Sequence, residues 1–169
     1  MPGSRTSDNF LRSFPILVLL SGIALMIYLY LKKVTTYNLI TGSKVHDLLK
    51  KDGFNDNLAA WSLCQCAHET NGFTSSIFNS NNNVCGMKYD GQALSTGEKN
   101  GYASYNTIED SVRDLVNWYS ICRRRIFSLP LYINSLADYV SFLKNNDYFE
   151  ADESEYLKGC QFFYDKVFK

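Results

Sequence analysis

The chain has 169 residues, which is enough for one domain of ordinary size and leaves little room for a second. Its composition is 46% hydrophobic, and its 17 basic and 17 acidic residues give a formal net charge of zero. The hydrophobic content excludes an intrinsically disordered chain. The charge balance, with no dominant basic segment in the larger part, excludes a protein that holds nucleic acid through a broad basic surface.

The five cysteines are scattered and odd in number, so they do not make a complete disulfide framework. Cys64, Cys66 and His68 lie close enough in the sequence to suggest a metal site. On a helix, however, Cys64 and Cys66 point to roughly opposite sides, and the three side chains do not converge on one ion. We therefore predict that the cysteines are small buried apolar residues.

The N-terminal segment differs in character from the rest. Residues 14–31 read FPILVLLSGIALMIYLYL, without a charge, and a helix of this length measures about 27 Å, close to the thickness of a bilayer core. A cleaved signal peptide is the alternative, but the continuation LKKVTTYN offers no small-residue cleavage site. We expect residues 1–33 to form a tail and an uncleaved transmembrane anchor, and residues 34–42 a polar linker. Basic residues on both flanks leave the orientation open.

Helical periodicity dominates after the linker. Ser43 can cap a first helix, and Asn55 or Asp56 a second that ends near Glu69. Residues 70–83 are polar and rich in turn formers, and the glycines of residues 84–105 predict a small β-hairpin or irregular lobe.

Three more helices are predicted in the C-terminal half. Thr107 and Asp110 form a capping box before a long amphipathic helix. Its apolar positions are Ile108, Val112, Leu115, Tyr119, Cys122 and Ile126. Ser135 and Asp138 form a second capping box, and a last helix carries Tyr156, Cys160, Phe163 and Val167. The predicted fold class is mainly α with one small β-hairpin lobe.

Glu69 stands apart from the other acidic residues, most of which lie on helix faces that we expect to be exposed. It ends an apolar helix and opens a loop rich in Gly and Asn, within CAHETNGF. Apolar neighbours would raise the pKa of this carboxyl and keep it protonated near neutral pH, as a glycosidase acid requires. The structural alternative is that Glu69 only caps its helix or forms an ion pair.

Three segments together resemble the glucosaminidase family, glycoside hydrolase family 73, which is related to lysozyme in fold. They are AHETNGFTSSIFNSNNNVCGMKY, GYASYNTIEDSVRDLVNWY and LKNNDYFEADESEY, and the resemblance spans residues 43–168. The matching positions are Glu69, Thr70, Ser75, Asn82, Asn83, Gly86, Met87, Lys88, Tyr105, Ser111, Asp114, Tyr148, Asp152 and Tyr156. The resemblance implies a lysozyme-like α-rich catalytic domain over residues 43–169.

Three positions depart from the family pattern. Asn71 stands where the family has a Gly, with Gly72 one place later. Cys85 replaces a Phe, and Tyr102 replaces the Phe that opens the tyrosine motif. These differences bear on substrate preference more than on catalysis.

The resemblance implies that Glu69 is the general acid and that Tyr105 lies near the cleavage point. Asn82 and Asn83 would frame the groove, unless their role is purely structural, since Asn mimics backbone turns well. The expected substrate-binding residues are Asn82, Asn83, Phe73, Tyr102 and Tyr148.

A second catalytic carboxylate is expected in the Gly-rich lobe if the enzyme uses two. Only Asp90 and Glu98 lie between Glu69 and the tyrosine motif. We favour Glu98, because its segment STGEKNG could close over a sugar, whereas Asp90 could simply pair with Lys88. The substrate's own acetamido group is the alternative to both.

The function implied by the resemblance is hydrolysis of the β-1,4 bond after N-acetylglucosamine in peptidoglycan, with no metal or organic cofactor. The alternatives are a lytic transglycosylase on the same fold and a non-catalytic anchor that binds glycan or forms part of a virion or envelope. The expected partners are peptidoglycan strands and, through residues 14–31, a membrane. The expected location of the domain is outside the cytoplasm of a bacterium, or in a phage particle.

Overall fold

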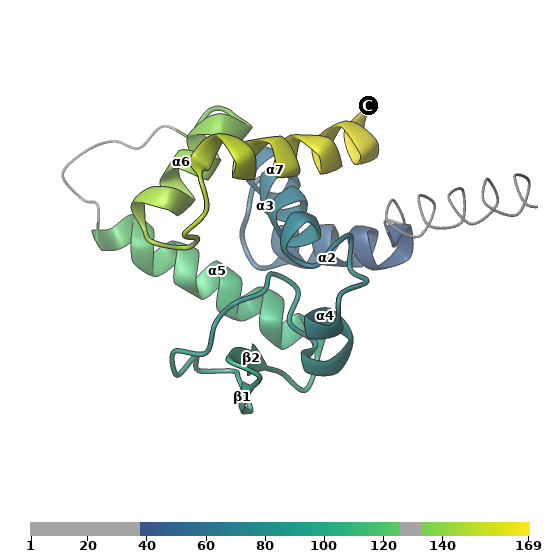
Figure 1. Ribbon diagram of the computed structural model, residues 1–169, viewed down its shortest axis with the longest axis vertical. Helices are drawn as coiled ribbons and strands as arrows, with labels where there is room; N and C mark the ends of the chain where they lie inside the picture. Colours follow the sequence, from purple (N-terminus) through teal and green to yellow (C-terminus); the bar gives the residue numbers. More distant parts are fainter. Residues whose placement is uncertain (1–37, 126–132) are drawn as a thin grey trace, which may run out of the picture. The chain divides into compact units, whose positions relative to one another are not determined.

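The computed structural model describes residues 38–125 and 133–169 (Figure 1). The predicted tail and anchor, residues 1–33, lie outside the described residues. Within the described ranges, no helix is both long enough and apolar enough to cross a bilayer.

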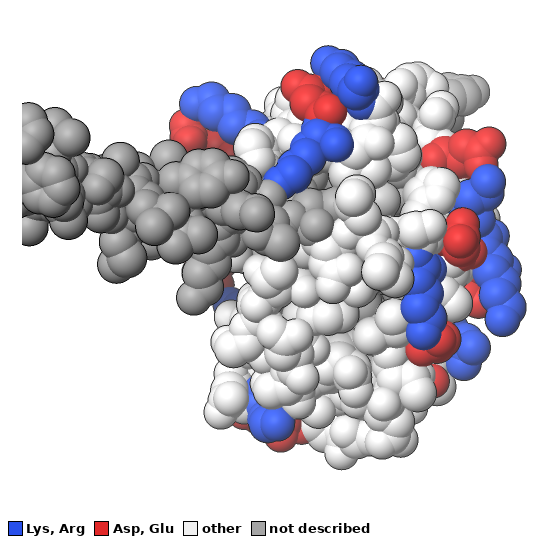
Figure 2. Space-filling model, turned by 90° about the vertical axis from the view of Figure 1, so that its right-hand side faces the viewer, with Lys and Arg blue, Asp and Glu red and all other residues white. Residues whose placement is uncertain are grey.

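The described chain is mainly helical, as predicted, with one small antiparallel hairpin. Its elements are α2 (Leu39–Lys51), α3 (Asp56–Glu69), α4 (Ser76–Asn81), β1 (Gly97–Lys99), β2 (Tyr102–Ser104), α5 (Ile108–Arg125), α6 (Leu136–Asn145) and α7 (Glu153–Phe168). On the face shown in Figure 2, basic and acidic side chains lie beside one another in small mixed groups and form no patch of one sign.

Helix α2 begins earlier than the sequence predicted. Its N-cap is Asn38, whose side chain accepts a hydrogen bond from the Thr41 N–H over 3.1 Å. Ser43 therefore lies within the helix, and residues 39–42, predicted as linker, form its first turn. Ser and Asn are about equally good caps, so composition alone does not choose between them.

Helix α3 is the centre of the domain, in contact with α2, α6 and α7 (Figure 1). The sequence predicted one apolar face, but every residue from 58 to 67 is buried. Two of its buried polar side chains bond to α6, since Ser62 bonds the Tyr139 hydroxyl over 2.8 Å and Tyr139 donates to the Gln65 side-chain oxygen over 2.5 Å. A helix enclosed on several sides holds its last residue, Glu69, in a fixed place.

The predicted caps of the other helices are confirmed. Asn55 accepts from the Leu58 N–H, and the Thr107 and Ser135 hydroxyls accept from the N–H groups three residues on. The segment 70–83, which the sequence marked as polar and rich in turn formers, contains the short helix α4, which Ser75 caps. The predicted apolar position Ile126 falls outside the described residues.

The small lobe is the predicted hairpin, with Gly97 opposite Ser104 and Lys99 opposite Tyr102. Lys88 adds an isolated bridge to Tyr102. The amide of Asn83 organises the lobe from inside, because it donates to the carbonyls of Met87 and Ala103 and accepts from the Met87 N–H.

The cysteines depart from the prediction in one respect. Cys66 and Cys85 form a disulfide, whereas Cys64, Cys122 and Cys160 are buried thiols as expected. Sequence spacing gave no sign of this pair, because its two members lie on different elements, α3 and the loop after α4.

Candidate active site

Glu69 is the last residue of α3 and is half-buried. The hydroxyl of Tyr156, on α7, donates a hydrogen bond to its Oε1 over 2.5 Å. Burial raises the pKa of the Glu69 carboxyl, and the bond from Tyr156 opposes part of that rise. Burial also raises the pKa of Tyr156, so this hydroxyl stays protonated and remains a donor.

The second oxygen of Glu69 faces the backbone of Gly86. A Cβ at Gly86 would lie 3.2 Å from Oε2, and the φ of this residue is +62°. Glycine is therefore required at position 86 for two reasons: the backbone is left-handed, and it approaches the Glu69 carboxyl closely. The two oxygens of Glu69 therefore have different surroundings: the hydroxyl of Tyr156 lies beside Oε1, and the backbone of Gly86 lies beside Oε2.

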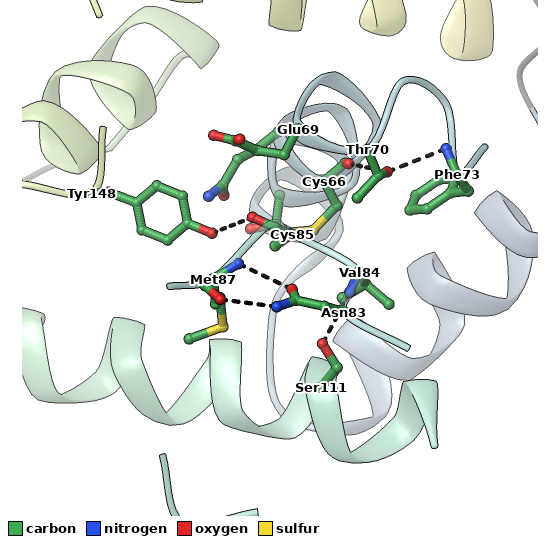
Figure 3. The surroundings of a disulfide bond; sticks show 12 residues. Cys66, Glu69, Thr70, Phe73, Asn83, Val84, Cys85, Met87, Ser111 and Tyr148 are labelled. Atoms are coloured by element: carbon green, nitrogen blue, oxygen red, sulfur yellow. Dashed lines mark hydrogen bonds between the residues drawn. A yellow bond between two sulfur atoms is a disulfide. The ribbon is translucent and has the colours of Figure 1, made fainter. Parts of the chain in front are cut away.

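The turn after Glu69 differs from the family pattern in sequence but is well ordered by hydrogen bonds. The Thr70 hydroxyl donates to the Cys66 carbonyl over 2.6 Å and accepts from the Phe73 N–H over 3.2 Å (Figure 3). Asn71, Gly72 and Phe73 all have φ between 50° and 67°. The left-handed run turns the chain back toward the core, where Phe73 packs against Phe78.

The disulfide fastens the small lobe to α3 beside Glu69. Cys66 lies one turn before Glu69, and Cys85 directly precedes Gly86. The carbonyl of Cys85 also accepts a hydrogen bond from the Tyr148 hydroxyl over 2.8 Å (Figure 3). Residues from α3, from the lobe and from the α6–α7 connection are thus tied together around one carboxyl.

A cleft of about 820 Å³ opens beside Glu69. One wall is the lobe segment 86–93 with Tyr102, the opposite wall is the segment 147–150, and α5 supplies the floor. Glu69, Tyr102, Tyr148 and Asp90 are the expected site residues that line it. A rim ion pair joins the two walls, since Lys88 lies 2.9 Å from Glu150.

Four expected site residues do not line the cleft, and three of them, Tyr105, Phe73 and Asn83, are buried inside the fold. Tyr105 is 3% exposed, with its hydroxyl 3.9 Å from the Met87 sulfur, and burial raises its pKa. Phe73 is 1% exposed. Asn82 ends α4 in a left-handed conformation and donates to the carbonyls of Tyr105 and Asn106. Asn83 is the buried centre of the lobe, so the side chains of both asparagines hold backbone carbonyls and neither lines the cleft.

The two candidates for the second carboxylate occupy different places. Asp90 is exposed and lines the cleft, and within the described residues its carboxylate makes no hydrogen bond or ion pair. Lys88 pairs with Glu150 instead of Asp90. Glu98 lies on β1 opposite Ala103, on the other face of the hairpin from the cleft-lining Tyr102, and its Oε1 accepts from the Gly101 N–H over 3.1 Å.

Several residues around Glu69 were not singled out as site residues from the sequence. Phe149 stacks on Tyr156 with centroids 3.7 Å apart, and His68 packs edge-on against the same ring at 4.8 Å. Gly159 leaves room for His68, because a Cβ there would clash with the imidazole. The only sign of a role for Tyr156 in the sequence was its match to one of the family motifs.

Trp118 and Asp114 also line the cleft, on the α5 floor. Asp114 is 4% exposed and accepts from the Leu94 N–H over 3.0 Å, which fixes the loop before β1 to α5. Burial raises the pKa of this carboxyl. Among the residues that the structure covers, no group of three His, Cys, Asp or Glu side chains is placed to hold a metal ion.

The sequence model of a known family matches most of this structure. The family is Glucosaminidase, described as mannosyl-glycoprotein endo-beta-N-acetylglucosaminidase, and the match covers residues 50–166. The chain belongs to this family. The match includes α3, the lobe and all the cleft-lining residues, and it supports a glycoside hydrolase that acts on a glycan. No curated protein and no solved structure matches the chain significantly.

Proposed function

We propose that the protein is a peptidoglycan hydrolase, an endo-β-N-acetylglucosaminidase that cleaves the β-1,4 bond with Glu69 as general acid. The observation that carries this proposal is the environment of Glu69. A half-buried carboxyl with a raised pKa ends a rigid helix and lines a cleft within a glucosaminidase domain. Such a group can be protonated near neutral pH and give its proton to a leaving oxygen.

The proposed proton lies on Oε2. Tyr156 donates to Oε1, so in the protonated acid Oε1 is the carbonyl oxygen that accepts this bond. The acidic hydrogen then belongs to Oε2, on the Gly86 side. As the glycosidic bond breaks, this proton moves to the leaving sugar oxygen, and the bonding electrons leave with that oxygen. The remaining sugar develops oxocarbenium character.

Water then adds to the sugar, and the proton it loses goes to a base. We propose that this base comes from the small lobe. Asp90 already lines the cleft, whereas Glu98 reaches it only if the hairpin closes over the glycan. The alternative is the substrate's acetamido group, which would need neither carboxylate. The rates of Asp90→Asn and Glu98→Gln distinguish these candidates for the base. Only the variant that lacks the base loses as much rate as Glu69→Gln.

A location outside the cytoplasm is part of the proposal. Peptidoglycan lies there, and the Cys66–Cys85 disulfide is of a kind that persists in oxidising compartments. Residues 14–31 would be the anchor that keeps the domain near the wall. A reporter that is active only in the cytoplasm, fused after Lys169, should stay silent.

The products of digestion test the function. Purified full-length protein in detergent is incubated with peptidoglycan, and the soluble fragments are analysed by mass spectrometry. The proposal predicts fragments with N-acetylglucosamine at the reducing end. Fragments that end in an anhydro sugar would identify a lytic transglycosylase, and the absence of any product would favour a glycan-binding or virion structural protein.

A further inference from the structure

Trp118 lies on the floor of the cleft, on a different helix from Glu69. Asp114, Trp118 and Ile121 all line the cleft and recur at helical spacing along one face of α5. From Asp114 to Ile121 the helix axis advances about 10 Å. This floor is about as long as a disaccharide, so it offers binding surface beyond the sugar that Glu69 would protonate.

The ring of Trp118 is held in place by two aromatic neighbours. Tyr148 contacts it edge to face, with centroids 4.8 Å apart and an interplanar angle of 69°. Phe142, which is 1% exposed, makes a second such contact at 6.3 Å and 75°. Edge-to-face contacts fix the plane of a ring. Trp118 therefore lies half-buried in the cleft with its orientation set before any ligand arrives.

The indole N–H of Trp118 is available to a ligand. Within the described chain, its indole N–H donates no hydrogen bond. Trp61 is a useful comparison, since it is 7% exposed, packs against Tyr139 and does not line this cleft, as expected of a core tryptophan. A core role alone does not explain why Trp118 lines the opening, or why exposed polar residues such as Asn117, Asp147 and Glu150 lie around it.

We propose that Trp118 forms a sugar-binding subsite for one pyranose ring of a β-1,4-linked glycan strand, next to the ring at the cleavage point. The proposal rests on the proposed function for the identity of the glycan. The face of an indole is electron-rich, and the axial C–H groups of a pyranose carry partial positive charge, so the two surfaces attract while hydrophobic area is buried. The free indole N–H and the nearby amide and carboxylates suit sugar hydroxyls.

The subsite is tested in the Glu69→Gln background, where the glycan binds without being cleaved. The probes are the tetramer of β-1,4-linked N-acetylglucosamine and its dimer. Isothermal titration calorimetry of the full chain measures tetramer affinity, because this readout does not depend on the tryptophan that is replaced. Trp118→Leu, which keeps apolar bulk but removes the aromatic face, should weaken tetramer binding about tenfold, or about 1.4 kcal/mol. Trp118→Tyr should restore part of the affinity, and dimer binding should change much less.

The matched control is Phe162→Ala, which truncates a half-exposed aromatic on α7 that does not line the cleft. It should bind the tetramer as the parent does. Thermal melting of each variant shows that the fold is kept. Equal tetramer affinity in the parent and Trp118→Leu would overturn the subsite, as would failure of the folded parent to bind the tetramer. Neither result touches the hydrolase proposal, which fails only if wild-type protein releases no reducing-end N-acetylglucosamine.

Discussion

The hydroxyl of Tyr156 donates to Oε1 of Glu69 over 2.5 Å, and this bond joins the C-terminal helix to the proposed catalytic acid. Phe149 stacks on one face of the Tyr156 ring and His68 packs against it edge-on, so the phenol has little freedom to move. Tyr156 therefore has two effects on Glu69. It fixes the orientation of the carboxyl, and it lowers the pKa that burial raises.

Tyr156→Phe should separate these two effects. The loss of a donor to the carboxylate disfavours the charged form, so the pKa of Glu69 should rise and the alkaline limb of the pH–rate profile should move to higher pH. Loss of orientation should lower kcat about tenfold. Tyr164→Phe, on the same helix and outside the cleft lining, is the control and should change neither. An alkaline limb that moves to lower pH would contradict this account.

Gly86→Ala tests the close approach between the lobe and Glu69. The added methyl would lie 3.2 Å from Oε2, so the carboxyl would have to shift and kcat should fall at least tenfold. Gly91→Ala is a matched control, because its φ of +70° brings similar backbone strain while nothing lies within 4 Å of its Cβ. Both variants should lose about 1 kcal/mol of stability. If kcat falls equally in both, contact with Glu69 is not the cause.

The Cys66–Cys85 disulfide should matter for both stability and activity. Closing a loop of 19 residues corresponds to about 3 kcal/mol in the chain-entropy description. Loss of the bond also frees Gly86 from α3, so kcat should fall together with the melting temperature. The measurement compares wild type with the Cys66→Ala, Cys85→Ala double variant, each with and without reductant. The double variant should not respond to reductant, and a wild type that keeps full activity after verified reduction would contradict this role.

Glu69→Gln should be at least as stable as wild type at neutral pH. Burial raises the pKa of Glu69 in the folded state above its unfolded value, near 4.3. The wild-type fold therefore loses stability as pH rises from the unfolded pKa to the folded pKa. Gln carries no charge at any pH, so the variant does not lose this stability, and its side-chain oxygen still accepts the hydrogen bond from Tyr156. Melting temperatures measured from pH 3 to 8 should show that the difference between the Gln variant and wild type becomes smaller as the pH falls. A variant that is less stable than wild type at pH 7 would favour a purely structural Glu69.

Much of the fold could be predicted from local sequence rules. The caps at Asn55, Thr107 and Ser135 are short-range features, and each is present as a side-chain hydrogen bond to the backbone. The start of α2 was placed too late, because Ser43 and Asn38 are equally good caps and only tertiary packing decides between them.

The site was harder to predict, since its contacts join distant segments. Glu69 could be found from its place at the end of an apolar helix. The Cys66–Cys85 pair, the bond from Tyr156 and the Trp118 floor depend on how α3, α5, α7 and the lobe meet, which spacing does not encode. The resemblance implied that Tyr105 lies near the cleavage point, and Phe73 was expected among the substrate-binding residues, but both are core residues.

The rate of Glu69→Gln on cell walls tests the central claim most directly. Full-length wild type and variant, at equal concentration and with matched melting curves, are added to purified peptidoglycan, and the release of reducing-end N-acetylglucosamine is followed over time. Loss of a general acid costs about a hundredfold or more, so the variant should release almost none. If Glu69→Gln releases the sugar at the wild-type rate, Glu69 is not the acid and the account is wrong.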